Sequence, residues 1–268
     1  MSSISTALSR RWTQLCRSQQ LARRSAMKRG GSSPMDALKG KIPDSVREKL
    51  EWAFCKGFSA VFEYGDDVIE KTIDTKGQRR RFIGRELGFI MEGSSASLSA
   101  FEMSGLKSDG LNMLLTTAEG VGLGLLGVGM PDIVLFVAIL LRGVREAAAQ
   151  YGRETDSDGE KMLMLYILET AMLSGRDWVE RDEAIERMLE GSALIPGDPE
   201  SAEAQLERTA AAFATDLLVM KFIQGLPIVG ALGGLGNPLY YRRVLSYARL
   251  KYERAYIREA MSRLKEEQ

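Results

Sequence analysis

The sequence predicts an all-α fold, and three observations support that prediction. Apolar residues recur at helical spacing over long stretches of the 268-residue chain. Prolines and capping residues stand where several of these stretches begin. No stretch of convincing length alternates apolar and polar residues as a half-buried strand does. With 45% apolar and 27% charged residues, the composition is that of a globular protein, so we expect a multi-helix bundle.

The first helix of this bundle is expected just after Pro43, where Asp44 or Ser45 can cap a helix with one broad apolar side. The polar run 75–81 then predicts the first break in the helical pattern, with a second helix after it. Ser108 or Asp109 can cap the next helical segment, over residues 111–118.

Further helix starts follow along the chain. Pro131 suits the first position of a helix that is apolar all round, and Gly152 suits the residue just beyond its end. Ser157 and Glu160 have capping-box spacing, which predicts a helix through Met172. Three more helices are expected from Asp177, from Pro199 and from Pro238, the last with Asn237 as its cap.

Residues 1–40 differ in composition from the rest of the chain. They carry eight basic residues and one acid, a net charge of +7, whereas the remainder carries 28 basic and 35 acidic residues, a net charge of −7. A basic leader of this kind is typical of a transit peptide or an interfacial anchor, and equally of a disordered tail or an over-extended start before Met27 or Met35. We therefore divide the chain into a weakly ordered basic leader or targeting segment, 1–40, and a helical domain, 41–268.

The residue inventory excludes several kinds of chemistry. The chain has no histidine, which removes histidine-based nucleophilic catalysis and histidine metal ligands. Its two cysteines, Cys16 and Cys55, are too few for a zinc or iron–sulfur site and indicate a reducing compartment. Cys55 follows Phe54 on an apolar helix side, where a lone cysteine usually fills space. We expect no metal and no cofactor.

Two segments, 119–132 and 225–238, are glycine-rich and apolar. The first ends in Pro131-Asp132 and the second in Asn237-Pro238. Neither has the strand and Lys-Ser/Thr context of a phosphate-binding loop. The run 121–141 is long enough to span a bilayer, but Asp132 near its centre would cost about 2.5–3.5 kcal/mol on insertion. We therefore expect two Gly/Pro-rich hairpins, which lie in a soluble core or dip into a membrane surface.

If the hairpins dip into a membrane surface, the sequence also predicts which residues contact the lipid. Leu232 and Leu235 are the apolar contacts of the second hairpin, and nearby basic side chains can meet anionic headgroups at about 1 kcal/mol each. The expected partner is a membrane surface or a membrane protein, and the expected location is cytoplasmic and peripheral to the membrane, or an organelle reached through residues 1–34. The basic residues expected at this contact are Lys221, Arg242 and Arg243.

An enzyme is the rival class, and the sequence gives it no local signature. Without histidine, a hydrolase would use carboxylates or a carboxylate-bound metal. Glu119 and Asp132 flank the first glycine-rich segment and are the candidate acids, although Asp132 is better explained as a stabiliser of the helix start at Pro131. The tyrosines and arginines of the last helix could contact RNA, but acids interleaved among them favour a packing helix, so we expect no nucleic-acid partner.

Several motifs follow one another in a characteristic order. They are Gly127-Val-Gly-Met-Pro-Asp-Ile-Val, Leu140-Leu-Arg-Gly-Val-Arg, Gln150-Tyr-Gly, Pro227-Ile-Val-Gly-Ala and Gly236-Asn-Pro. Together, these motifs resemble the EcsC protein family over residues 45–265. The namesake of that family is encoded beside an ABC transporter, and its activity is not established, so the resemblance implies no catalytic residues. We therefore expect a non-enzymatic protein, and the resemblance implies an accessory factor to a transporter or another membrane process.

Overall fold

The computed structural model describes residues 3–30, 43–72, 75–94, 131–191, 201–223 and 238–266. In these ranges the regular structure consists of helices, and no strand occurs, which confirms the all-α prediction. The helices of the described ranges are α1 (Ser3–Gly30), α3 (Asp44–Thr72), α4 (Thr75–Glu92), α7 (Pro131–Gln150), α8 (Asp158–Met172), α9 (Gly175–Leu189), α10 (Ala202–Ile223) and α11 (Pro238–Glu266).

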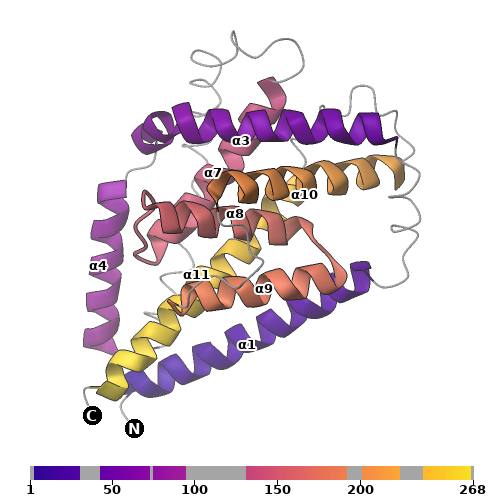
Figure 1. Ribbon diagram of the computed structural model, residues 1–268. Coiled ribbons are helices and arrows are strands. Elements are labelled where there is room, and N and C mark those ends of the chain that lie inside the picture. The colour runs from indigo at the N-terminus through magenta and orange to yellow at the C-terminus, as the bar shows by residue number, and fades with distance from the viewer. Residues whose placement is uncertain are drawn as a thin grey trace.

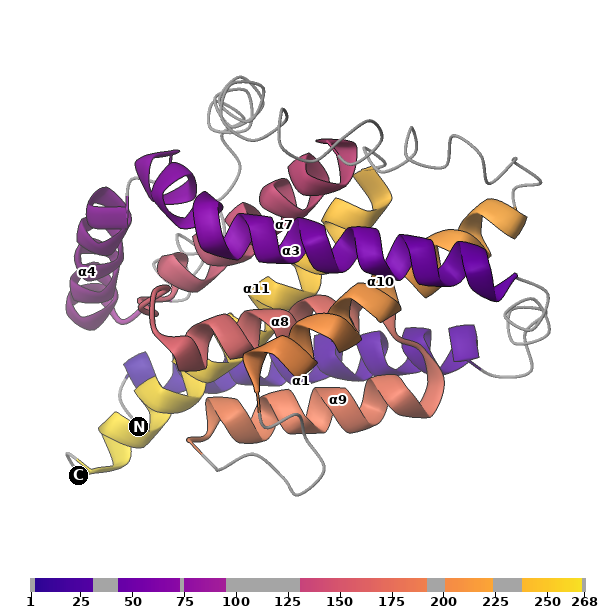
Figure 2. The same ribbon diagram turned by 45° about the horizontal axis from the view of Figure 1, so that its top comes forward.

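Helix α11 runs obliquely through the middle of the bundle (Figure 1). It contacts α1, α7, α8 and α9, while α3 and α10 pack together on the opposite side and reach the core through α7 and α8. Helix α4 stands at one side against α7, and the two ends of the chain lie close together (Figures 1 and 2). The sequence predicted an amphipathic packing helix at the C-terminus. Because several helices surround it, α11 is instead buried along most of residues 244–257.

Aromatic rings join α3, α7 and α10 on the far side of α11. Phe213 of α10 lies with its ring centroid 5.6 Å from that of Phe54 and 5.7 Å from that of Phe58, both on α3. It also meets Phe136 of α7 edge-on at 6.1 Å. Such contacts add about 0.5–1.5 kcal/mol each beyond the apolar area that they bury. Gly143 lets α7 approach α11 closely, since a Cβ there would lie 2.9 Å from a methyl of Leu245.

Several predicted helix ends are confirmed. Helices α7 and α11 begin at Pro131 and Pro238. Ser157 caps α8, because its side chain accepts a hydrogen bond from the Glu160 amide, and α8 ends at Met172. Gly152 follows the end of α7 with a φ of 79°, a conformation that glycine adopts without strain.

Other boundaries differ from the prediction. The polar run 75–81 is not a break but the first part of α4, in which Arg80 and Arg81 are exposed while Phe82 and Phe89 pack inward. Helix α9 begins at Gly175 rather than at Asp177, with Ser174 as its N-cap. Helix α10 begins at Ala202, where Ser201 accepts a hydrogen bond from the Ala204 amide.

The basic leader is the largest difference. A weakly ordered segment was expected over residues 1–40, but residues 3–30 form α1, which packs against α9 and α11. Leu8 and Leu15 are almost completely buried in the common core. The arginines of α1 find acids on those two helices: Arg11 pairs with Glu253 at 2.5 Å, and Arg23 lies 3.8 Å from Glu183. Composition alone could not show these distant partners.

Both predicted hairpins extend mainly outside the described residues, which begin again at Pro131 and at Pro238. The segment 111–118, with Ser108 or Asp109 as its cap, and Asn237 lie outside them as well. None of the helices in the described part of the chain is long and apolar enough to cross a membrane.

Candidate functional site

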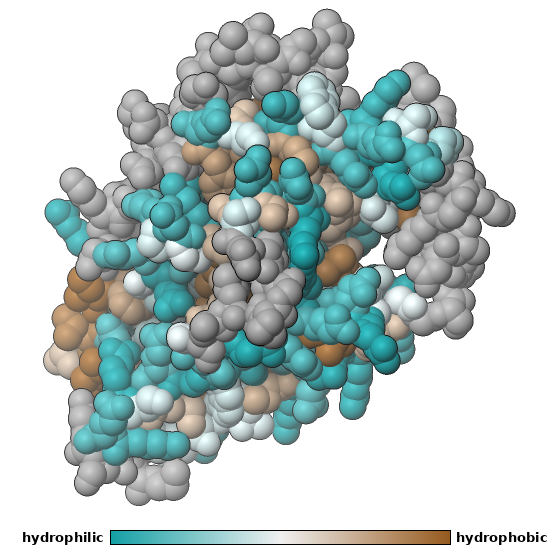
Figure 3. All heavy atoms as spheres, viewed as in Figure 1, coloured by the Kyte–Doolittle hydropathy of each residue, from teal (hydrophilic) through white to brown (hydrophobic). Residues whose placement is uncertain are grey.

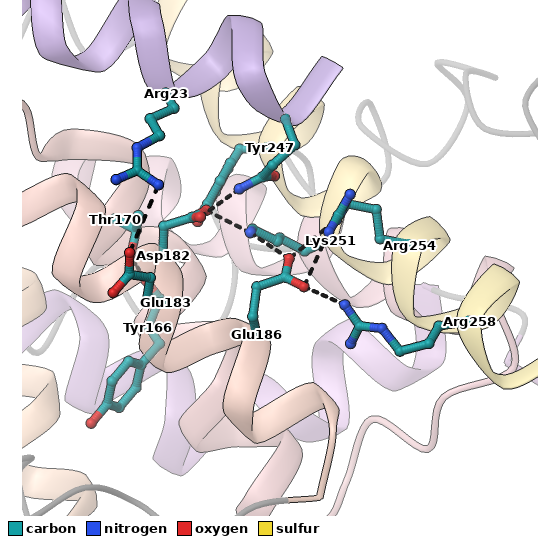
Figure 4. A network of polar contacts seen from close by, with 11 residues as sticks. Arg23, Tyr166, Thr170, Asp182, Glu183, Glu186, Tyr247, Lys251, Arg254 and Arg258 are labelled. Atoms are coloured by element: carbon teal, nitrogen blue, oxygen red, sulfur yellow. Dashed lines mark hydrogen bonds and ion pairs between the residues drawn. The ribbon is translucent and has the colours of Figure 1, made fainter. Parts of the chain in front are cut away.

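A cluster of charged side chains joins α9 to α11. We call it the charge cluster, and Lys251 is at its centre (Figure 4). The Lys251 side chain is 0% exposed, and its Nζ lies 2.5 Å from Asp182 Oδ1 and 2.8 Å from Glu186 Oε1. An ammonium buried this deeply costs several kcal/mol to desolvate, and two carboxylates compensate it here. The other members of the charge cluster are Arg254 and Arg258.

Glu186 is the acceptor that these cations share. Arg254 Nε lies 3.2 Å from Glu186 Oε1, and Arg258 Nη2 lies 2.5 Å from Glu186 Oε2. Burial by itself would raise the pKa of Glu186, but Lys251 and Arg254 together outweigh it and lower that pKa to about 2. Glu186 is therefore ionised at any physiological pH.

Helix α1 closes the charge cluster from outside. Gln19 donates a hydrogen bond to Asp182, and the indole of Trp12 lies under two guanidinium groups, with the Arg254 Cζ at 4.7 Å and the Arg258 Cζ at 5.5 Å from the ring centroid. The Tyr247 hydroxyl donates to Asp182 Oδ1 at 2.6 Å. Since the Lys251 ammonium is held by two carboxylates, it is not available as a nucleophile or a base. The charge cluster therefore has a structural role, because it joins α9 to α11 and α1 covers it.

The α1–α11 cavity lies beside the charge cluster and has a volume of about 560 Å³. Tyr247 belongs to both, because its ring also forms part of the cavity wall. The α1 side chains that line it recur every three or four residues along one face, from Arg11 to Arg29. The lining residues of α1 are Arg11, Leu15, Ser18, Ala22, Ser25 and Arg29, and the opposite wall includes Arg243, Ser246, Tyr247, Arg249, Leu250 and Glu253.

The two ends of the α1–α11 cavity differ in how their charges are balanced. At one end Arg11 pairs with Glu253. At the other end Arg243 pairs with Asp216 at 3.0 Å, and Arg29 adds a second guanidinium beside them. Burial and the nearby Arg243 lower the pKa of Arg29, which indicates that two cations compete for one carboxylate.

An acid-lined cavity of about 420 Å³ lies on the other side of Asp216, between α8, α9 and α10. Glu169, Asp177 and Asp216 line it, together with Arg47 of α3 and Arg208 of α10. Glu169 accepts a hydrogen bond from Gln205 at 2.7 Å, and burial raises the pKa of Asp216. Over the described ranges, no three Asp, Glu or Cys side chains gather closely enough to hold a metal ion.

Helix α4 presents an apolar stripe to solvent. Its members recur at helical spacing and are 47–85% exposed, and Figure 3 shows them as a hydrophobic edge of the molecule at the position of α4. Gly84 and Gly88 lie on an adjoining face with open space beside them. The apolar stripe of α4 consists of Ile83, Leu87, Ile90 and Met91.

Of the predicted contact residues, the structure describes the side chains of Arg242 and Arg243. Arg242 is exposed, but Arg243 points inward, pairs with Asp216 and lies over the Tyr240 ring at 5.5 Å. Asp132 lies in α7 and Lys221 in α10. The candidates Glu119, Leu232 and Leu235 lie outside the described residues.

Cys55 behaves as the sequence suggested. Its side chain is partly buried against the core, and burial raises the pKa of its thiol, which lowers its reactivity as a nucleophile. The sequence interpretation predicted a helix containing Ile83, Leu87 and Ile90, but it did not show that these apolar side chains are exposed, because helical spacing does not say what covers a face. It also missed the α1–α11 cavity, which no local pattern reveals, because its walls are about 200 residues apart in sequence.

The profile of the EcsC protein family matches residues 10–256 of the 268. The chain belongs to the EcsC protein family. No curated protein and no solved structure matches it significantly. The EcsC match begins earlier than the resemblance over 45–265 had implied, so it includes most of α1. The EcsC region therefore contains both walls of the α1–α11 cavity and the charge cluster except Arg258.

Proposed function

We propose that this EcsC-family protein is a non-enzymatic helical protein that binds peripherally to an anionic membrane surface, as an accessory factor to a transporter or another membrane process. The observation that carries the membrane part is the apolar stripe of α4. The accessory role follows only from the resemblance to a family whose namesake is encoded beside an ABC transporter.

The apolar stripe of α4 has the dimensions of an interfacial contact. Ile83, Leu87 and Ile90 succeed one another at i, i+4 and i+7, so they form one row along the helix, with Met91 beside it. Removing one such side chain from water contributes about 1.5–3 kcal/mol when burial is complete. The opposite face is anchored, because Phe89 is buried and Glu86 pairs with Arg263 of α11 at 2.8 Å. The stripe is therefore held outward on a fixed helix.

Charge identifies the surface that this stripe fits. Helix α4 contains five basic and two acidic residues, and most of its basic residues lie in the first two turns, just before the stripe. Each basic residue near an anionic lipid surface contributes about 1 kcal/mol. A second copy of this chain would bring another basic helix and would repel the first, so an anionic membrane is the occupant that the charge favours. The basic residues of α4 are Lys76, Arg79, Arg80, Arg81 and Arg85.

Flotation of the full chain with vesicles tests this proposal. We expect binding to phosphatidylcholine vesicles that contain phosphatidylserine, and weaker binding to phosphatidylcholine alone. Leu87→Ser combined with Met91→Ser should reduce binding about tenfold or more, since at least 1.4 kcal/mol of apolar burial is lost. The matched control is Leu21→Ser, which removes an exposed leucine from α1 and should leave binding unchanged.

Two outcomes would overturn the proposal: absence of flotation at every phosphatidylserine content, or flotation that the α4 pair of substitutions leaves intact. A variant with Leu232→Ser and Leu235→Ser shows whether α4 or the second predicted hairpin makes the membrane contact. If only this variant loses binding while circular dichroism shows a retained fold, the hairpin carries the contact and α4 does not.

A carboxylate hydrolase is the second candidate, and the acid-lined cavity is the observation that favours it. Burial raises the pKa of Asp216, as a general acid requires, and Asp177 lines the same cavity. Against this candidate, the ion pair between Asp216 and Arg243 favours a structural role for Asp216. The test is turnover of ester and phosphate-ester substrates by the full chain, with Mg²⁺ and with a chelator. Turnover that Asp177→Asn abolishes would establish the hydrolase.

A further inference from the structure

We propose that the α1–α11 cavity binds an amphipathic anion, namely a single acyl or alkyl chain with a phosphate or carboxylate head. This binding site does not depend on the proposed membrane contact, because it lies between α1 and α11 and shares no residue with α4.

The shape of the cavity favours a chain over a compact ring system. Its α1 wall extends from Arg11 to Arg29, which is about 27 Å at 1.5 Å per residue. A volume of about 560 Å³ distributed along this length makes a slot, within the range of about 300–1,000 Å³ that small-molecule sites occupy. The middle of the slot is lined mainly by small side chains, including Ser18, Ala22 and Ser25, so it has room for a ligand between the two helices.

The head group belongs at the Arg29 end of the slot. Two guanidinium groups, Arg29 and Arg243, meet there, and both interact electrostatically with the carboxylate of Asp216. Asp216 is hydrogen-bonded to Arg243 and is therefore committed to it. Among the described residues at this end, two guanidinium groups share one carboxylate, so one positive charge is left, which an anionic ligand would balance.

Arg29 also has an unused donor. Its Nη2 donates to the Leu173 carbonyl oxygen at 3.2 Å, whereas its Nε is buried and has no hydrogen-bond partner among the described residues. Guanidinium groups bind phosphate and carboxylate through parallel N–H donors, and a charge-assisted bond of this kind is about twice as strong as a neutral one. An oxyanion beside Arg29 would satisfy the donor that the protein leaves unpaired.

The opposite end explains why the ligand needs an apolar body. Glu253 pairs with Arg11 there and also accepts a hydrogen bond from Tyr151, so the positive charge of Arg11 is balanced within the protein. Between the ends, the apolar walls are Leu15, Leu250 and the indole of Trp178. These side chains offer a chain dispersion contacts, so a hydrocarbon body fits against them, while Arg249 adds a further basic side chain to the α11 wall.

Isothermal titration of the full chain with decyl phosphate, below its critical micelle concentration, tests the site. Decanoate is titrated in parallel, and the tighter of the two anions identifies the head. Inorganic phosphate has the head without the chain, and decanol the chain without the head. We expect both to bind at least tenfold more weakly than decyl phosphate.

Two substitutions locate the binding. Arg29→Gln removes the guanidinium with the unpaired Nε and should weaken binding of the anionic amphiphile about tenfold or more; Arg242→Gln, on exposed α11 surface outside the lining, is its control. Ser25 lines the slot at its exposed side, so Ser25→Leu narrows the slot and should weaken binding similarly; Ser262→Leu, likewise exposed but outside the lining, is its control. The α4 pair Leu87→Ser and Met91→Ser should leave this titration unchanged, which separates it from vesicle binding.

The inference is overturned if neither amphiphile binds at millimolar concentration. It is also overturned if inorganic phosphate or decanol binds as tightly as decyl phosphate, or if Arg29→Gln and Ser25→Leu bind like the native chain.

Discussion

At the scale of single residues, the Lys251 ammonium has the most demanding environment, because it is completely buried between two carboxylates. Lys251→Met should reduce the free energy of unfolding by about 3–5 kcal/mol, since Asp182 and Glu186 would remain buried without their central cation. Urea denaturation measures the loss, and Lys265→Met, exposed on the same helix, should change stability by less than about 0.5 kcal/mol. A loss below 1 kcal/mol for Lys251→Met would contradict the structural role of the charge cluster.

Glu186 gives stability a defined pH dependence. Its pKa in the folded protein is about 2, below the ordinary value of 4.5, so folding favours its ionised form. The resulting stabilisation, on the order of 3 kcal/mol, is fully present above about pH 5 and is lost as the pH falls towards 2. Urea denaturation between pH 6 and pH 2 should therefore show Glu186→Gln well below the native chain at pH 6, with the gap closing on acidification. Glu183→Gln, exposed on the same helix, is the control; a gap that stays constant with pH would refute this account.

At the scale of elements, two serines provide a matched test of helix capping. Ser157 accepts a hydrogen bond at the start of α8, whereas Ser174 occupies the same position before α9 and its side chain makes no capping bond. Ser157→Ala should therefore cost about 1 kcal/mol of stability, and Ser174→Ala only a few tenths. Thermal denaturation of both variants checks this, and equal losses would show that the side-chain bond is not what distinguishes them.

Helix α1 is an integral element of the folded domain. Leu8 is 1% exposed, so Leu8→Ala should cost about 2–5 kcal/mol, while Leu21→Ala, at an exposed position of the same helix, should cost little. Chemical denaturation compares the two. Equal, small effects would mean that α1 packs too weakly to contribute to stability and would restore the idea of a detachable leader.

The elements divide into those that the sequence could and could not predict. Helix ends that depend on local chemistry, such as Pro131, Ser157 and Pro238, were predictable, because a cap or a proline acts within a few residues of itself. Helix α1 was not, because its order depends on partners such as Glu253, more than 240 residues away from Arg11. The helix after the polar run 75–81 was predicted, but that run was mistaken for a break because its basic residues lack the apolar spacing that begins at Phe82.

At the scale of the whole molecule, salt should modulate the proposed membrane contact. The Debye length falls from about 10 Å at 0.1 M to about 3 Å at 1 M salt, so the attraction of the basic turns of α4 to anionic vesicles should be largely screened. Vesicle flotation across this range should show weaker binding at high salt, with a residual fraction due to the apolar stripe. Binding to neutral vesicles should change little, and salt-independent binding to anionic vesicles would contradict the role of charge.

The candidate sites are also properties of the whole molecule, which is why the sequence revealed so little of them. Arg29 and Arg243 come from opposite ends of the chain and meet only in the folded bundle. Arg243 was singled out as a headgroup contact from its position alone, yet Asp216 draws it inward. In each case the sequence showed that the residue is charged, but it did not show which residue it contacts in the folded protein.

The pairing of α1 with α9 and α11 has a consequence for how the protein is made. The ribosome releases α1 before α11, and at about 5–20 residues per second the interval between Gly30 and Pro238 is on the order of tens of seconds. Throughout that time Trp12 lacks the guanidinium groups of α11 that cover it in the folded protein. Helix α1 is then a basic amphipathic helix with part of its partner surface not yet made, and a chaperone or a nearby bilayer can hold it until α11 emerges.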